Sequence, residues 1–225
     1  MVRNVFILGR PGTGKSYIAQ LIQKSAKNKG WIADHIYDYQ LLQDMFSEEV
    51  LKSVPPGERS FRPRGPEAYC GFDVINFDVL DTVLVRMADK VRKETTFFPE
   101  ENRLFLIEFA RKEYGPALHK FGAGILQGAF LFYIKAEMET CLERVHQRVR
   151  DGSPFGHFVS DEIMKGYYRS DDWLDGGLRE YLAVLGRDGV SVQTEEIDNT
   201  VSDDVLYNRV EELVRTRLIS ELAAV

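Results

Sequence analysis

Hydrophobic residues occur along the chain in short runs that are separated by longer stretches with helical spacing. Apolar runs of about four to eight residues are typical of strands that are buried in a parallel sheet. Five such runs occur, at residues 5–8, 31–37, 104–109, 129–134 and 190–197, of which the last is the most polar. Because helical segments alternate with these runs, we predict an α/β fold with five parallel strands and helices on both faces of the sheet.

The helical segments are recognised by apolar residues that recur about every 3.6 positions. They span residues 17–28, 41–54, 77–92, 137–149, 161–168 and 203–222. The second and third strands are separated by an unusually long excursion, residues 55–95, which begins with a proline- and glycine-bearing loop. An excursion of this length usually carries a binding element, so we expect it to hold the substrate.

Length and charge limit the class of protein. The 225 residues fit one domain, residues 1–225, and the net charge of −6 makes an extended nucleic-acid-binding surface an unlikely feature. Cys70 and Cys141 lack metal-ligand spacing and fit buried thiols in a reduced compartment. No apolar run is long enough to span a bilayer, and the first strand leaves no room for a signal peptide. We therefore expect a cytoplasmic protein that does not enter a membrane.

The most specific motif lies between the first predicted strand and the first predicted helix. It is the octapeptide Gly9-Arg10-Pro11-Gly12-Thr13-Gly14-Lys15-Ser16, which matches the P-loop pattern G-x-x-x-x-G-K-[ST]. The glycines let backbone N–H groups turn toward phosphate oxygens, Lys15 reaches the β- and γ-phosphates, and Ser16 holds Mg²⁺. We predict that this octapeptide and the adjacent Tyr17 bind ATP together with Mg²⁺.

Carboxylates follow the second and third predicted strands, at the sheet edge where ligands of parallel sheets bind. Asp38 is placed to accept a proton from an acceptor hydroxyl, but an N-cap of the next helix explains it equally well. Glu108 ends an apolar run, as does the acidic residue that holds Mg²⁺ in P-loop proteins. Arg111 lies at the same edge and is able to pair with Glu108 or to bind a phosphate of the substrate.

Arginines follow the fourth strand. Arg144, Arg148 and Arg150 precede a glycine-containing loop, and residues 144–170 have the composition of a lid that closes over phosphates. A solvated helix face is the alternative explanation of these arginines.

Two further loops offer candidate contacts. Asn199 follows the fifth strand, where it either approaches the adenine base or belongs to an Asx-type turn. Arg64 lies in the excursion with Arg59 and Arg62, and either binds an anionic acceptor or only solubilises the loop.

The P-loop and the lid segment together resemble a known group of enzymes. Gly9-x-Pro11-Gly12-x-Gly14-Lys15-Ser16 is similar to the P-loop of nucleoside- and nucleotide-kinase-like proteins, which include adenylate kinase, gluconate kinase and the zeta toxins. The resemblance implies a three-layer P-loop NTPase fold with the strand order 2-3-1-4-5. It also implies that Asp38 is the catalytic base, because an Asp after the second strand has this role in the relatives.

Two departures from the pattern leave the acceptor open. The third strand ends in Glu108-Phe109-Ala110-Arg111, which is closer to the Glu-Arg element of deoxynucleoside kinases than to the zeta toxins. The loop at residues 55–66 matches no substrate signature of the group.

The motifs favour an ATP-dependent phosphotransferase that acts on a small-molecule acceptor, such as a nucleoside, a nucleotide or a metabolite hydroxyl. Catalysis is then expected from Lys15, Asp38, Arg144 and Arg148, because phosphoryl transfer depends on positioning and on charge neutralisation. The alternative is a regulatory P-loop NTPase with slow or no hydrolysis. We expect a monomer or a homodimer.

Overall fold

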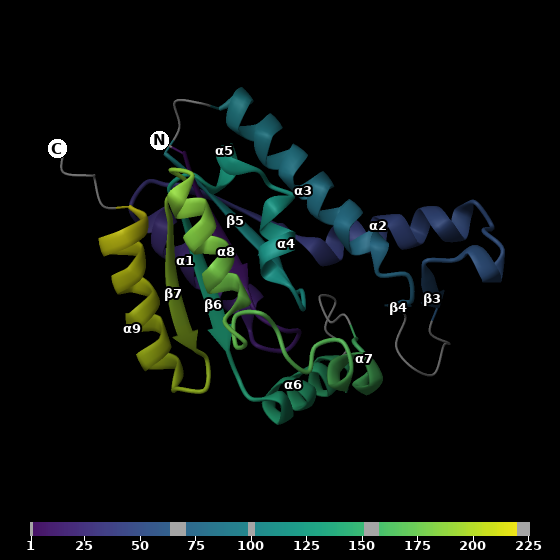
Figure 1. Ribbon diagram of the computed structural model, residues 1–225. Helices are drawn as coiled ribbons and strands as arrows, with labels where there is room; N and C mark the ends of the chain where they lie inside the picture. The colour runs from purple at the N-terminus through teal and green to yellow at the C-terminus, as the bar shows by residue number, and fades with distance from the viewer. Residues whose placement is uncertain (1, 64–70, 99–101, 151–157, 220–225) are drawn as a thin grey trace.

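A five-stranded parallel sheet forms the centre of the protein, and helices cover both of its faces (Figure 1). The computed structural model describes residues 2–63, 71–98, 102–150 and 158–219. Across the sheet the strands are β2 (Ile32–Tyr37), β5 (Arg103–Phe109), β1 (Val2–Leu8), β6 (Ala129–Lys135) and β7 (Val192–Asp198). Counted along the chain, these five parallel strands stand in the order 2-3-1-4-5, which confirms the expected three-layer fold.

The central strands are apolar on both sides because each side faces a layer of helices. Side chains alternate across a strand, so Phe6 and Leu8 of β1 join one core cluster while Val5 and Ile7 join the other. The first cluster is covered by α3 (Asp78–Phe97), α4 (Tyr114–His119), α5 (Ala123–Leu126) and α8 (Gly177–Arg187). The second is covered by α1 (Lys15–Asn28), α9 (Asp203–Leu213) and the π-helical turn η2 (Val214–Leu218).

The excursion between β2 and β5 contains more regular structure than its sequence indicates. After α2 (Asp38–Leu51) and a short 3₁₀ helix (Pro56–Glu58), β3 (Phe61–Pro63) and β4 (Phe72–Val74) form an antiparallel hairpin. Phe46 of α2 packs against both strands, with ring centroids 5.9 Å from Phe61 and 4.7 Å from Phe72. The hairpin is thereby held against α2 beside the sheet (Figure 1).

The region after β6 passes beyond the carboxyl end of that strand before the chain returns to the sheet (Figure 1). It consists of α6 (Met138–Arg150), α7 (Asp161–Lys165) and α8. Of these three helices, α8 was not predicted by the sequence analysis. The predicted C-terminal helix is present as α9 and η2, and residues 220–222 of that prediction lie outside the described residues. Among the described helices, none has both the length and the apolar composition required to cross a bilayer.

Three consecutive residues, Asp171, Asp172 and Trp173, join this region to the core. The Asp171 carboxylate accepts a 2.8 Å hydrogen bond from the Tyr133 hydroxyl, and Trp173 stacks on the Tyr133 ring at 4.7 Å. Asp172 accepts hydrogen bonds from the amides of Tyr114 (2.7 Å) and Gly115 (2.8 Å), the first two residues of α4. Those amides have no partner inside their own helix, so Asp172 acts as a cap supplied from elsewhere in the chain.

The cap predicts the effect of one substitution. Asp172→Ala removes both acceptors and is expected to lower the free energy of unfolding by about 1–2 kcal/mol. Asp188→Ala is the matched control, because Asp188 is exposed at the end of α8, and it is expected to change the same quantity by less than about 0.5 kcal/mol. Urea unfolding of both variants measures the difference, and equal effects would refute the capping role.

Candidate active site

The P-loop joins β1 to α1 and adopts a backbone that only glycine tolerates at three positions. Gly9, Gly12 and Gly14 have φ angles of 142°, 85° and 91°. A Cβ atom on Gly9 would lie 2.6 Å from the carbonyl oxygen of Ile134, and one on Gly12 would collide with the backbone of Cys141. The sequence pattern is therefore required by the close approach of neighbouring elements as well as by the left-handed φ angles.

Residues from distant parts of the chain hold the loop in place. The Gly9 amide donates to the buried Tyr114 hydroxyl at 3.0 Å. On the other side, the Asn199 side-chain amide donates to the Thr13 carbonyl at 2.6 Å. Arg144 donates to the Asn199 carbonyl at 2.8 Å and to the Thr13 carbonyl at 3.4 Å. The structure thus brings two predicted site residues, Arg144 and Asn199, directly to the P-loop.

Lys15 is buried at the start of α1, beneath the loop. Its Nζ donates to the Arg10 carbonyl at 3.0 Å, and the Thr13 hydroxyl donates to the same oxygen at 3.0 Å. Burial lowers the pKa of Lys15, while the negative charges of Glu108 and Asp38 act in the opposite direction. A buried ammonium group held among carboxylates is suited to meet the phosphates of a nucleotide.

Glu108 connects the P-loop to β2. Its Oε1 accepts a hydrogen bond from the Ser16 hydroxyl at 2.9 Å, and its Oε2 lies 2.8 Å from His35 Nε2. Burial by itself raises the pKa of Glu108, but the hydrogen bond from His35 and the charge of Lys15 outweigh it, so the pKa lies below its usual value. The sequence analysis did not identify His35 as a site residue. The one signal available was that His35 is a polar residue two positions before the end of β2.

The pair of Ser16 and Glu108 fits a magnesium site. Mg²⁺ is commonly held by few protein oxygens, with phosphate oxygens and water completing the octahedron. Ser16 and Glu108 provide two such oxygens next to Lys15. In the described ranges, no group of three or more His, Cys, Asp and Glu side chains is placed to hold a metal ion. With Ser16 and Glu108 as protein ligands, nucleotide phosphates and water would supply the remaining ligands of the ion.

Asp38 begins α2 and faces Arg111. The N-cap of α2 is Tyr37, and the Asp38 side chain accepts a 2.7 Å bond from Arg111 Nη1, so the N-cap interpretation is wrong. Arg111 is buried and also donates to the carbonyls of Leu80 (2.9 Å) and Ala110 (2.6 Å). The alternative Glu108–Arg111 pair is not formed, because β2 and β5 are neighbours and Asp38 lies closer. Arg111 thus holds the Asp38 carboxylate in position.

Two cavities are lined in part by P-loop residues. One, of about 400 Å³, is lined by Gly14, Tyr17, Arg144, Gln147, Arg148, Asn199 and Asp203. It brings together Tyr17, Asn199 and two of the three predicted lid arginines, Arg144 and Arg148. Arg148 has no hydrogen-bond partner among the described residues, and burial lowers its pKa. The Asx-type turn is also present, since Asp198 accepts from the Thr200 amide at 2.9 Å.

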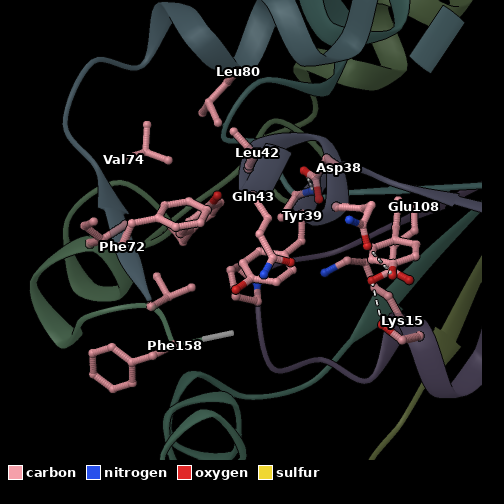
Figure 2. Close-up of a pocket in the computed structure, with 18 of the residues that line it drawn as sticks. Lys15, Asp38, Tyr39, Leu42, Gln43, Phe72, Val74, Leu80, Glu108 and Phe158 are labelled. Carbon is pink, nitrogen blue, oxygen red and sulfur yellow. Dashed lines mark hydrogen bonds between the residues drawn. The ribbon is translucent and has the colours of Figure 1, made fainter. Parts of the chain in front are cut away.

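The second cavity, of about 340 Å³, extends from the P-loop toward the hairpin (Figure 2). Lys15, Ser16, Asp38 and Glu108 line one end. Phe72, Val74 and Phe158 line the other, and Leu42 and Leu80 complete the wall (Figure 2). The sequence analysis expected the excursion to reach the substrate but did not identify these side chains, because the hairpin that presents them was not predicted.

The loop arginines have structural partners where the structure describes them. Arg62 pairs with Asp73 across the hairpin at 2.9 Å, and Arg59 donates to the Val54 carbonyl at 2.9 Å. Arg64 and the loop at residues 151–157 lie outside the described residues. The substrate contact predicted for Arg64 therefore stays a prediction.

Comparison with known proteins supports the fold. No protein-family model matches the sequence, and no curated protein matches it. Among solved structures, a protein from Chloroflexus aurantiacus provisionally described as a kinase is similar over 96% of this chain and 97% of its own, with 12% identity and a TM-score of 0.53. A gluconokinase from Sinorhizobium meliloti has 14% identity over 92% of this chain and 89% of its own, with a TM-score of 0.48. A shikimate kinase from Acinetobacter baumannii has 12% identity over 95% and 93%, with a TM-score of 0.45. The chain has the fold of the P-loop kinases.

Proposed function

We propose that the protein transfers the γ-phosphoryl group of ATP to a small-molecule acceptor. One observation carries the proposal, namely that a cavity of about 340 Å³ meets the P-loop at Lys15 and Ser16 and contains the Asp38 carboxylate at the same end. A protein that only binds or hydrolyses a nucleotide has no need of an acceptor chamber with a carboxylate at the phosphate. The kinase description of the similar C. aurantiacus structure agrees with this function.

The donor side of the reaction depends on fixed positive charge. Lys15 and backbone amides of the P-loop would bind the β- and γ-phosphates, and Arg148 lines the cavity that also contains Gly14 of the loop. Ser16 and Glu108 would hold Mg²⁺, which neutralises charge on the phosphates when bound. Because Lys15, Ser16 and Glu108 are already held by hydrogen bonds, little reorganisation of these three side chains is required when the charge develops.

The acceptor side depends on Asp38. Glu108 has both oxygens occupied by Ser16 and His35, whereas Oδ1 of Asp38 has no partner among the described residues. We therefore assign Asp38 as the base. The acceptor oxygen bonds to the γ-phosphorus as the bond from that phosphorus to the β,γ-bridging oxygen breaks. ADP leaves, and the hydroxyl proton passes to Asp38, whose position Arg111 maintains.

Substitution of Lys15 and Asp38 tests this assignment. Lys15→Ala is expected to abolish transfer from radiolabelled ATP to a panel of nucleosides, nucleotides and sugars. Asp38→Asn is expected to lower kcat by about 10²–10⁴-fold, because a positioned base contributes that much, while the Kd for ATP changes by less than about threefold. Asp78→Asn is the matched control, since Asp78 occupies the first turn of α3, is exposed and lies outside the cavity. Equal turnover in the wild type and in Asp38→Asn would overturn the assignment.

A second substitution tests the metal role of Glu108. Glu108→Gln keeps a hydrogen-bond acceptor for Ser16 but removes the negative charge, so the Mg²⁺ concentration for half-maximal transfer is expected to rise by about tenfold or more. Glu113→Gln, at the exposed N-cap of α4, is expected to leave it within about twofold. Titration of activity with MgCl₂ measures both variants, and an unchanged Mg²⁺ requirement in Glu108→Gln would exclude the role.

A further inference from the structure

The acceptor cavity allows the acceptor's chemical class to be named. We infer that the acceptor is an uncharged molecule that carries a flat heteroaromatic ring and a hydroxyl group, the chemistry of a nucleoside. The inference rests on the proposed function, because it assumes that the cavity beside Asp38 holds the acceptor. Three independent features of the described lining carry it: its charges, its aromatic faces and its amide groups.

The charges along the described lining disfavour an anionic acceptor. Lys15 is the one Lys or Arg side chain in that lining, and it lies at the P-loop, where the donor phosphates require it. The lining also holds three carboxylates, those of Asp38, Asp73 and Glu108. An acceptor phosphate or carboxylate would lose its water next to these acids and to apolar side chains, with no second cation in the described lining to compensate.

The same carboxylates do not call for a cationic acceptor, because each one already has a partner. Arg111 donates to Asp38 at 2.7 Å and Arg62 to Asp73 at 2.9 Å. Glu108 contacts Ser16 and His35 and lies near the charge of Lys15. With its acids compensated in this way, the cavity is suited to a neutral molecule.

Flat aromatic faces line the part of the cavity away from the P-loop. Tyr39 and Phe72 lie nearly parallel, with an interplanar angle of 9° and centroids 5.8 Å apart. Phe77 also lines the cavity and is backed by Tyr167 in a second parallel stack, at 4.5 Å and 7°. Figure 2 shows Phe72 and Phe158 at the end opposite Lys15 and Glu108. Phe72 is buried and also stacks on Phe46, so the exposed Phe77, backed by Tyr167, is the residue that can offer an aromatic face to a ligand. Such a face favours a flat ring over a flexible polyol.

Amide groups in the cavity lining supply neutral hydrogen bonds. Gln20 and Gln43 line the cavity, and their side chains have no partner among the described residues. Gln23 donates its Nε2 to the Ala33 carbonyl, which leaves its own oxygen as an acceptor. A carboxamide offers a donor and an acceptor side by side, which matches the edge of a nucleobase. The volume of about 340 Å³ lies near the lower end of small-molecule sites and suits one such molecule.

Matched acceptors test the inference in the wild-type chain. The panel pairs adenosine, guanosine, cytidine, uridine and thymidine with their 5′-monophosphates, and adds gluconate and choline as an acid and a cation. With radiolabelled ATP and Mg²⁺, at least one nucleoside is expected to exceed its monophosphate, gluconate and choline by about 100-fold or more in kcat/KM. Faster transfer to a monophosphate, gluconate or choline would overturn the inference and leave the proposed kinase function standing.

Binding without ATP separates the two proposals. In calorimetric titrations without ATP, a nucleoside is expected to bind the protein with a lower Kd than its monophosphate. If a nucleoside binds but no acceptor is phosphorylated, the proposed function fails and the class of ligand stands. If no nucleoside binds or reacts, the inference is wrong.

A charge substitution gives a sharper outcome. Gln43→Lys places a cation in the cavity lining, where it would attract the phosphate of a nucleoside monophosphate. The ratio of kcat/KM for a nucleoside to kcat/KM for its monophosphate is therefore expected to fall by about tenfold or more. Gln193→Lys makes the same change at an exposed position of β7 that does not line the cavity, and is expected to leave the ratio within about twofold. An unchanged ratio in Gln43→Lys, with circular dichroism showing a folded protein, would contradict the inference.

Discussion

The structure depends on one steric constraint, which is that the phosphate loop must approach neighbouring elements more closely than a side chain on its glycines would allow. Space for a Cβ atom is missing at Gly9, Gly12 and Gly14, where Ile134, Cys141 and Asn199 already lie. These neighbours come from the end of β6, from α6 and from the turn after β7. The loop conformation is therefore set by the order of the strands, because β1 has to lie beside β6 for these contacts to exist.

The same constraint determines the electrostatics of the site. A loop packed this tightly leaves Lys15 buried under the Arg10 carbonyl, where an ammonium group on its own would be costly. The cost is reduced because β1 also pairs with β5, and the register places Ile7 opposite Glu108. Glu108 therefore lies close enough to Lys15 for each charge to favour the other. Steric fit and charge balance thus have a single origin in the pairing of β1 with its two neighbours.

The sequence predicted the features that depend on local pattern. The five parallel strands, the P-loop and the acids at the strand ends follow from periodicity and from a motif, and the structure bears out their placement. The partners of those acids could not be predicted in the same way. Arg111 was expected to pair with Glu108 or to bind a phosphate, yet in the structure it pairs with Asp38, since the adjacent β2 ends beside it. A partner choice of this kind is decided by three-dimensional position alone.

The hairpin and α8 were missed for different reasons. β3 and β4 have three residues each, and what holds them is the contact of Phe61 and Phe72 with Phe46, which no local pattern encodes. For α8 the signal was available, because Leu178, Tyr181, Leu182 and Leu185 recur with helical spacing and join the core. The residues lining the acceptor cavity were missed with the hairpin that presents them.

Two of the predicted lid arginines, Arg144 and Arg148, differ in a way that the sequence could not distinguish. Arg144 donates hydrogen bonds to the carbonyls of Thr13 and Asn199, so it holds the phosphate loop to the turn after β7. Arg148, one turn further along α6, lines the same cavity with no described hydrogen-bond partner. A partly buried guanidinium without protein acceptors is well placed to bind an incoming anion. Of the two, Arg148 is therefore the side chain that a bound phosphate would satisfy, and Arg144 the one that keeps the loop in the shape to receive it.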